Sequence, residues 1–516
     1  MKKGWKVIGI GWLALTLAAT TVLAGSEKLA SDLKSHNEDG NVDVIVQFKA
    51  TPTEAHQQKV RQLGGTLQDK MDFIKAAHYS IPASALQDLS ANPDVVFITP
   101  NRSLHGMMDI PAQAVNAAAA VAAGYTGAGI GVAVIDSGMA SLPSDFQMGG
   151  NKGIVYTADF TGISAPDQYG HGSHVAGLIA SNGDGTVYTG IVPDASLIIL
   201  RVLDQNGSGT DASVINAINA AISLKSRYNI RVINLSLGRP VFEAAALDPL
   251  CQAVEAAWKA GIVVVVAAGN GGRDNSEGNA GYGTIAAPGN DPFVITVGAM
   301  KDMHTSTRTD DLIASYSSKG PTRFDHFVKP DILAPGNQIV STMKSNAVLA
   351  NTYGAIAYGK DHYLLSGTSM ATPIVSGAAV VLIQQNPSLT PDQVKARLMN
   401  TASKTFPVSS VAVDATTGIA YTSYYDIFTV GAGYLDIAAA LSNTDLAAGS
   451  ALSPTAVFNA ATGQVTLADT AVSGTTAVWG STAVWGSTAV WGSTAVWGSS
   501  TNDATESISV AIEGEQ

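Results

Sequence analysis

Residues 131–136 read Gly-Val-Ala-Val-Ile-Asp, an unbroken apolar run that ends in a carboxylate. Ala-rich stretches of helical character separate it from similar runs further along the chain, at 197–200, 232–235 and 262–266. Uninterrupted Val and Ile runs are typical of strands that are covered on both faces. The sequence therefore predicts an α/β domain over residues 108–443, with a mostly parallel, doubly wound sheet between layers of helices. Polar residues just after such strands gather at one edge of the sheet, and Asp136 and Asn270 stand at those places.

An acid, an imidazole and an alcohol follow one another along the chain, at Asp136, His171 and Ser369. Their flanks are Asp-Ser-Gly at 136–138, Gly-His-Gly-Ser-His at 170–174 and Gly-Thr-Ser-Met-Ala-Thr-Pro at 367–373. A serine hydroxyl is a weak nucleophile at neutral pH, so it needs a base within hydrogen-bond reach and a third group that orients the imidazole. Each motif by itself is ordinary turn or loop chemistry, but the three in this order predict a hydrolase with a nucleophilic serine.

The surroundings of this candidate triad fit the same interpretation. Ser369 precedes an apolar helical stretch whose amino-terminal dipole favours negative charge, and Pro373 is expected among the early helical positions that need no N–H group. His174 competes with His171 as the base, but the Gly-His-Gly setting favours His171 and leaves His174 a structural role. Asn270 is the expected side-chain donor to an oxyanion, although an Asn followed by two glycines is also a good turn signal.

Composition excludes several classes of protein. The net charge of −12 over 516 residues argues against a nucleic acid as partner, because phosphate binding depends on clustered Lys and Arg. Cys251 is the only cysteine, so no intrachain disulfide is possible, and its amphipathic surroundings predict a buried structural thiol.

Residues 1–24 have the charged start, apolar centre and small-residue end of a secretory signal peptide; a membrane anchor is the alternative, but the apolar run is short for one. We therefore expect a secreted protein without a later membrane span.

Three further segments differ from the central domain. Residues 25–40 are polar and predict a flexible lead, and residues 41–107 alternate strand-like and helical stretches, as a small α+β module does. Residues 444–516 form a low-complexity C-terminal extension in which Ala-Val-Trp-Gly-Ser-Thr recurs, with Trp479, Trp485, Trp491 and Trp497 six residues apart. So short a repeat buries no core of its own. The tail is therefore either disordered or loosely attached, or an array of strands that binds a sugar or a surface.

From residue 124 to 436 the chain resembles the subtilisin family of serine peptidases, the subtilases. All three motifs of the candidate triad match, as do the Asn270 motif and the stretches at 232–238 and 329–336. The resemblance implies a subtilisin-like fold and a serine endopeptidase that hydrolyses polypeptide substrates through an acyl-enzyme. It also implies that no cofactor is required, that residues 41–107 are an inhibitory prodomain acting in cis, and that the enzyme is a monomer. Self-processing is expected near Met107, with Leu104 as the P4 residue.

The resemblance also assigns substrate-binding residues. Two backbone segments would hold the substrate as an added strand, which predicts broad specificity: Gly207, Ser208 and Gly209, and Ser236, Leu237 and Gly238. The S1 pocket would be walled by Ala267, Ala268 and Gly269, with Ala286 near its floor. Asp211 stands where relatives often carry the aromatic lid of the S4 pocket. Some relatives bind Ca²⁺ in the loop that corresponds to residues 182–188, where Asp184 is the candidate ligand, although the same sequence is ordinary turn chemistry.

Two alternatives remain open on the sequence. One is a protease whose activity is narrowed to the processing of a single partner. The other is a catalytically silent adhesion or binding protein, in which a peptidase-like domain carries the Trp repeats.

Overall fold

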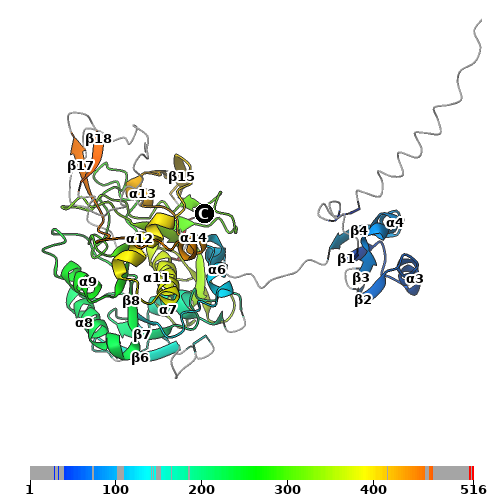
Figure 1. The fold of residues 1–516 in the computed structure, drawn as a ribbon, viewed down its shortest axis with the longest axis horizontal. Helices are drawn as coiled ribbons and strands as arrows, with labels where there is room; N and C mark the ends of the chain where they lie inside the picture. Colours follow the sequence, from blue (N-terminus) through cyan, green and yellow to red (C-terminus); the bar gives the residue numbers. More distant parts are fainter. Residues whose placement is uncertain are drawn as a thin grey trace, which may run out of the picture. The chain divides into compact units, whose positions relative to one another are not determined.

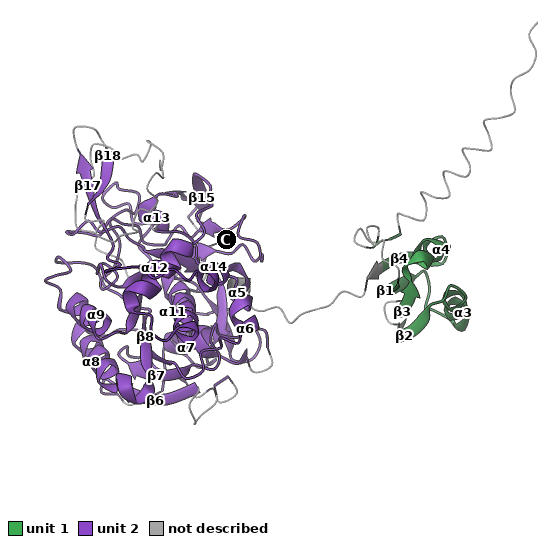
Figure 2. Cartoon of the chain, viewed as in Figure 1, with its two compact units in different colours: residues 1–106 green, residues 107–516 purple. Residues whose placement is uncertain are grey.

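The computed structural model (Figure 1) describes residues 28–29, 33, 40–72, 75–100, 110–140, 142, 145–146, 153–163, 166–183, 186–414, 417–459, 464–468, 511–512 and 514–515. The chain forms two compact units, residues 1–106 and 107–516 (Figure 2). Several expectations fall outside the described residues: the signal peptide, most of the flexible lead, the junction near Met107, the candidate ligand Asp184 and the Trp repeats.

The first unit is an antiparallel sheet with helices α3 (Glu54–Gln62) and α4 (Leu86–Ser90). Its strands lie in the order β2-β3-β1-β4, with bounds β1 (Asn41–Phe48), β2 (Thr66–Met71), β3 (Ala76–Pro82) and β4 (Val95–Pro100). Val44, Val46 and Phe48 alternate with more exposed residues along β1 and join one buried cluster, because successive side chains of a strand point to opposite faces. The unit has a core of its own and is of the α+β class.

The second unit is built on a sheet of eight described strands, in the order β11-β10-β9-β8-β5-β7-β6 with β12 beside β10. Their bounds are β5 (Gly131–Asp136), β6 (Gly153–Asp159), β7 (Ser196–Arg201), β8 (Ile230–Leu235), β9 (Val263–Ala267), β10 (Ile295–Lys301), β11 (Leu312–Ile313) and β12 (Ile332–Pro335). All of these pairings are parallel except that of β10 with β11. The predicted parallel sheet is confirmed.

Helices cover this sheet, and every residue of β5, β7 and β9 is buried. Helix α8 (Asp211–Tyr228) packs on β5, β7 and β8 beside α9 (Pro249–Lys259). Helix α11 (Thr368–Gln385) packs on β8, β9, β10 and β12 beside α7 (His171–Ala180). Figure 1 shows α8 and α9 at one side of the unit and α11 in its middle. A helix with so little exposed surface is apolar all round, as the sequence of α11 is.

Smaller elements surround this framework. The remaining α-helices described in this unit are α5 (Ile110–Ala114), α6 (Ala118–Ala122), α10 (Val348–Asn351), α12 (Pro391–Thr401), α13 (Ile427–Val430) and α14 (Ile437–Ser442). Three antiparallel pairs are β13 (Ile339–Thr342) with β14 (His362–Leu365), β15 (Ser409–Val413) with β16 (Ala420–Tyr424), and β17 (Thr455–Asn459) with β18 (Gln464–Ala468). In the described part of the chain, no helix has the length and apolarity that crossing a bilayer requires.

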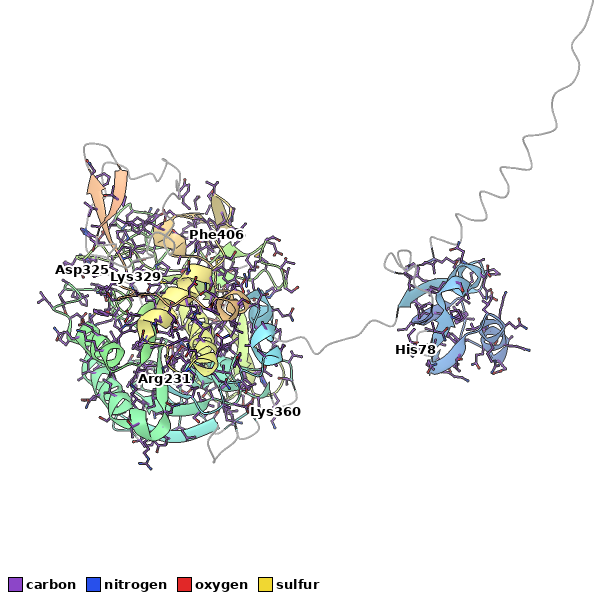
Figure 3. All side chains as sticks on the ribbon, viewed as in Figure 1. His78, Arg231, Asp325, Lys329, Lys360 and Phe406 are labelled. Carbon is purple, nitrogen blue, oxygen red and sulfur yellow. The ribbon has the colours of Figure 1, made fainter. Side chains whose placement is uncertain are left out.

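The Lys-Pro-Asp stretch that follows Val328 forms a buried ionic cluster. Lys329, which Figure 3 labels in the body of the second unit, lies with its Nζ 2.6 Å from Asp331 Oδ2. Lys395 Nζ lies 3.2 Å from Asp331 Oδ1, and Ser453 Oγ donates to the same oxygen at 2.6 Å. Buried charges need such partners, because desolvation of an unpaired ion is costly. The cluster joins β12 to α12 and to residues beyond 443.

Cys251 is a buried free thiol, as predicted. Its Sγ lies 3.3 Å from Asn290 Oδ1 on the buried face of α9. Burial raises the pKa of this thiol far above its usual value, with the neighbouring Asp291 and Asp248 adding to the effect. The thiolate form that a nucleophile would need is therefore disfavoured.

Candidate active site

The structure brings Asp136 and His171 into contact. Asp136 is the last residue of β5, and His171 is the first residue of α7. His171 Nδ1 lies 2.8 Å from Asp136 Oδ1, and the same oxygen accepts a hydrogen bond of 2.7 Å from the Ser137 N–H group. The Asp136 side chain is fully buried, whereas 14% of the His171 side chain is exposed. A carboxylate thus lies behind an imidazole that reaches solvent.

The two glycines of the Gly-His-Gly motif are required by a positive φ and by close approaches of neighbouring atoms. Gly170 has a φ of +103°, and a Cβ at this position would lie only 2.4 Å from Met343 Sδ. A Cβ on Gly172 would lie 2.4 Å from the carbonyl oxygen of Gly138, just after the Asp136 turn. Any side chain at either position would displace the start of α7, and with it His171.

Asp167 is a buried residue of this site that the sequence reasoning missed. Its Oδ1 accepts hydrogen bonds from Ser137 Oγ at 2.9 Å and from the Gly170 N–H group at 2.8 Å. Its Oδ2 accepts from the Ser173 N–H group at 2.8 Å and from Ser173 Oγ at 2.7 Å. One carboxylate therefore ties the residue after Asp136 to the first turn of α7. The only signal in the sequence was an acidic residue shortly before a helix start.

The two histidines of α7 have opposite electrostatic environments. Burial lowers the pKa of His171, but the charge and hydrogen bond of Asp136, with the charge of Asp167, outweigh it and raise the pKa above its usual 6.5. His174 is fully buried, and its Nε2 lies 3.0 Å from the Tyr363 carbonyl oxygen. Burial, together with the charge of His171, lowers the pKa of His174 to about 3. The structural interpretation of His174 agrees with this geometry.

Ser369 is the only residue between 368 and 383 of α11 that is not buried. Its Oγ donates a hydrogen bond of 3.1 Å to the carbonyl oxygen of Ser236. Within the described chain, no hydrogen bond joins Ser369 Oγ to His171. Both residues nevertheless line one cavity.

Pro373 lies deeper in α11 than expected. It is the sixth residue of the helix, where an N–H group would normally donate to the carbonyl of Ser369, four residues earlier. Proline has no N–H group, and Ser236 Oγ donates to this carbonyl instead, at 2.8 Å. Ser236 and Ser369 thus exchange two hydrogen bonds, one in each direction.

A buried polar chain supports this exchange. Asn234 Nδ2 donates to Ser236 Oγ at 3.0 Å, and Ser376 Oγ donates to Asn234 Oδ1 at 2.8 Å. Asn234 and Ser376 are both completely buried, so water cannot replace either bond. The chain couples β8 to the first and third turns of α11, at Ser369 and Ser376.

Asn270 follows β9 and lies beside the start of α11. Its Oδ1 accepts hydrogen bonds from the Thr368 N–H group at 2.9 Å and from Thr368 Oγ1 at 3.1 Å. Gly367 has a φ of +145°, and a Cβ at this position would lie 3.2 Å from Asn270 Nδ2. The side chain is therefore held by its oxygen, while its amide nitrogen remains available as a donor near Ser369.

A cavity of about 670 Å³ joins these residues. Its lining includes His171, Asn270 and Ser369, together with most of the residues expected to bind substrate: Gly207, Ser208, Gly209, Ser236, Leu237, Gly238, Ala267, Gly269 and Ala286. Two expected residues do not line it: Asp136 lies behind His171, and Ala268 is completely buried. A Cβ on Gly238 or on Gly269 would lie 3.0 Å or 3.2 Å from Ala286 Cβ, so Ala286 lies between these two walls.

The lining of the cavity includes part of an ion-pair cluster. Arg239 Nε donates to both oxygens of Asp211, at 2.9 and 3.0 Å, and Arg239 Nη2 donates to both oxygens of Asp248, at 2.8 and 3.0 Å. The Asp248 side chain is fully buried, whereas 44% of the Asp211 side chain is exposed. Asp211 and Arg239 line the cavity. The cavity therefore has a charged group at Asp211, where an aromatic side chain is frequent in the family that the sequence resembles.

The comparisons with known proteins agree on one family. A sequence model of the subtilase family matches residues 127–419. Serine protease AprX of Bacillus subtilis (strain 168) is 38% identical over 354 residues, which cover 66% of this chain and 76% of that protein. Subtilisin E of the same strain is 33% identical over 405 residues, covering 76% and 93%. A thermostable alkaline protease of Halalkalibacterium halodurans is 30% identical over 413 residues, covering 78% and 94%. The chain therefore belongs to the subtilase family and is a serine endopeptidase.

Proposed function

We propose that Asp136, His171 and Ser369 are the catalytic triad of this endopeptidase. Neutral His171 accepts the proton of Ser369 as its Oγ attacks the scissile carbonyl carbon, and it donates that proton to the leaving amine. Asp136 keeps the imidazole N–H group on Nδ1 and stabilises the imidazolium. Water then hydrolyses the acyl-enzyme through the same base. The observation that carries the proposal is the 2.8 Å contact of Asp136 with His171, at the wall of the cavity that Ser369 also lines.

The hydroxyl of Ser369 must turn before it can react. In the free enzyme it donates to the carbonyl of Ser236, and rotation about its Cα–Cβ bond would redirect it to His171. Catalytic hydrogen bonds are often completed only when substrate binds. The Ser369 carbonyl remains held by Ser236 Oγ throughout, so the backbone of the nucleophile need not move.

We assign the oxyanion site to Asn270 Nδ2 and the backbone N–H group of Ser369. The Ser369 N–H group lies in the first turn of α11, where N–H groups have no partner inside the helix and the helix dipole favours negative charge. Asn270 is held through its oxygen by Thr368, which leaves the amide nitrogen as the donor. Two fixed donors beside the nucleophile are the arrangement that tetrahedral intermediates of acyl transfer require.

Activity-based labelling tests the triad. A fluorophosphonate should label wild-type protein on Ser369, and it should leave Ser369→Ala unlabelled and label His171→Ala only slowly. Peptide mapping of the labelled residue gives the assignment. A label on another serine, or unchanged labelling of His171→Ala, would contradict the proposed roles. Ser223→Ala is a matched control, because it removes an exposed hydroxyl that bonds only within α8 and lies away from the cavity.

We propose broad specificity for extended polypeptides. Residues 207–209 and 236–238 line the two sides of the cavity along which a substrate strand would lie, and main-chain pairing of this kind reads few side chains. The Asp211–Arg239 pair in the lining disfavours a purely apolar substrate residue beside it. Casein turnover that the fluorophosphonate abolishes supports the broad protease. Labelling without casein turnover would favour the alternative, a protease that processes one partner.

The first unit is proposed to be an inhibitory prodomain, and the enzyme to be secreted and to process itself as a monomer. The proposal rests on the separate core of the first unit and on the signal-peptide pattern of residues 1–24. Ser369→Ala should accumulate as an uncleaved precursor, whereas wild type should yield a product that begins near Met108. A mature amino terminus near Met108 in the Ser369→Ala protein, expressed without other proteases, would refute self-processing.

The described residues of the 182–188 loop give no support to calcium binding there. The Gly183 carbonyl accepts hydrogen bonds from the Thr186 N–H group and from Thr186 Oγ1, so this oxygen is used within the turn. Among the described residues, no group of three or more His, Cys, Asp or Glu side chains is arranged to hold a metal ion. Melting of the protein with and without a chelator decides whether Asp184 belongs to a calcium site.

A further inference from the structure

The last described residues of the chain are bound to the peptidase unit. The Ser366 N–H group donates to the carbonyl of Ala511 at 2.9 Å, and the Ile512 side chain is 8% exposed and belongs to the main hydrophobic core. Glu515 is only 4% exposed. A glutamate is almost never buried unless it is paired, so its surroundings must supply partners.

The Glu515 carboxylate accepts hydrogen bonds at one oxygen and forms an ion pair at the other. Its Oε2 accepts from the Ser315 N–H group at 2.7 Å, from Ser315 Oγ at 2.7 Å and from Arg273 Nη2 at 3.2 Å. Lys301 Nζ lies 2.8 Å from Oε1. The Arg273 and Lys301 side chains are 8% and 6% exposed, so both cations are mostly desolvated. Two buried cations and two hydrogen bonds from one serine form a site shaped for a carboxylate.

The backbone of the same residue is held as well. Asn337 Oδ1 accepts from the Glu515 N–H group at 2.7 Å, and Asn337 Nδ2 donates to the Glu515 carbonyl at 2.7 Å. Gly514 has a φ of +65°, and a Cβ there would lie 2.4 Å from Ser366 Oγ. A two-point amide contact and a close glycine approach recognise a peptide in one register, which a non-specific surface contact does not do.

This contact lies next to the proposed nucleophile. Ser366 is three residues before Ser369, and Ala511 is itself part of the lining of the 670 Å³ cavity. The Gln338 N–H group donates to Ser366 Oγ at 2.8 Å, and the Gly367 N–H group donates to the Gly336 carbonyl at 2.7 Å. The C-terminal peptide, the loop after β12 and the start of α11 are therefore hydrogen-bonded together.

We propose that Arg273, Lys301, Ser315 and Asn337 form a binding site for the chain's own C-terminal peptide, anchored by Glu515, and that the bound peptide is a wall of the substrate cleft. The second part rests on the proposed function of the cavity. Ala511 and Ser366 line the cavity together, and neither belongs to the two segments proposed to hold the substrate strand, 207–209 and 236–238. On this proposal the peptide borders the part of the substrate that lies beyond the scissile bond, on the leaving-group side of Ser369.

Thermal unfolding of the full chain tests the binding site without any need for activity. In a Ser369→Ala background, Glu515→Gln removes the charge and leaves two buried cations with one carboxylate fewer, so we expect the melting temperature of the second unit to fall by about 4–6 °C. Lys301→Met should also lower it. The double variant should lose at least about 2 °C less than the sum of the single variants, because the two residues are directly paired.

Glu243→Gln is the matched control, since it makes the same change at a partly exposed glutamate and should leave the melting temperature within about 1 °C. Additive effects of Lys301→Met and Glu515→Gln, or a Glu515→Gln protein that melts like the control, would overturn the proposed binding site. Glu515→Gln by itself could prevent folding. In that case, a double variant that folds shows the coupling that the proposal requires. If both single variants and the double variant all fail to fold, the proposal is contradicted.

Kinetics in the active background test the cleft wall. Glu515→Gln should lower kcat/KM about fivefold for peptides extended beyond the scissile bond, and leave hydrolysis of a short p-nitroanilide within about twofold. Equal effects on both substrates would refute the wall. Absence of hydrolysis in the wild type would refute the proposed function instead. The thermal coupling would then still test the binding site for the peptide, because it does not depend on activity.

Discussion

Asp167 offers the sharpest test of how the fold prepares His171. The residue is buried, and its carboxylate accepts four hydrogen bonds, two from Ser173 and one each from Ser137 Oγ and the Gly170 N–H group. Asp167→Asn keeps the size of the side chain. It also removes the charge and replaces one acceptor oxygen by an NH₂ group.

The expected loss follows from these contacts. Hydrogen bonds to a charged group contribute about 1.5–3 kcal/mol each and neutral ones about 1 kcal/mol. With the Asn oxygen in the place of Oδ1, it would keep the hydrogen bonds from Ser137 and Gly170, now as bonds to a neutral acceptor. The Asn NH₂ group would then face the Ser173 N–H group, and two donors cannot form a hydrogen bond with each other. We expect a loss of about 4 kcal/mol in the free energy of unfolding. For a unit of roughly 400 residues, whose unfolding entropy is about 0.8 kcal/mol/K, this corresponds to a fall of about 5 °C in the melting temperature.

Calorimetry of the Ser369→Ala full chain measures this effect without self-digestion. Asp204→Asn is the control, because Asp204 Oδ1 accepts from the N–H groups of Asn206 and Ser208 and an Asn oxygen can accept both. In active protein, Asp167→Asn should also lower kcat by at least about tenfold, since the first turn of α7 carries His171. A melting temperature within about 1 °C of the parent, or equal to that of Asp204→Asn, would refute the argument.

Three other outcomes are expected. Asn270→Ala should lower kcat by about 10²–10³, the loss known for such a donor in a related subtilisin, with little change in KM. A variant with a raised KM and an unchanged kcat would contradict the oxyanion assignment. On the proposed role of His171 as a neutral base, kcat/KM should rise with pH through an apparent pKa above 6.5, because Asp136 raises the pKa of this imidazole; an acidic limb below pH 6 in the free enzyme would contradict this. Gly170→Ala should cost both stability and activity, since its Cβ would lie 2.4 Å from Met343 Sδ, and a variant with wild-type melting temperature and kcat would disprove the packing argument.

Much of the framework was predictable from local sequence. Unbroken Val and Ile runs predicted the buried parallel strands β5, β7, β8 and β9, because only a strand covered on both faces tolerates such a run. The position of Asp136 at a strand end and of Ser369 at a helix start also followed from local pattern. Pro373 did not follow, since its place in α11 depends on where the helix begins, and Gly367 sets that point with a φ of +145°.

The sequence by itself determined which groups are candidates for the reaction and on which elements they lie, because strand and helix periodicity and glycine-dependent turns are short-range properties. Only the tertiary structure decided which side chains are in contact. Asp136 contacts His171 across 35 positions of the sequence, Ser236 contacts Ser369 across 133, and Arg273 contacts Glu515 across 242. The physical reason is that a buried polar group must form a hydrogen bond or an ion pair, whereas the local sequence around it does not specify the partner. Asp167 and Glu515 show this most clearly, since each looks like an ordinary surface acid until folding removes it from water.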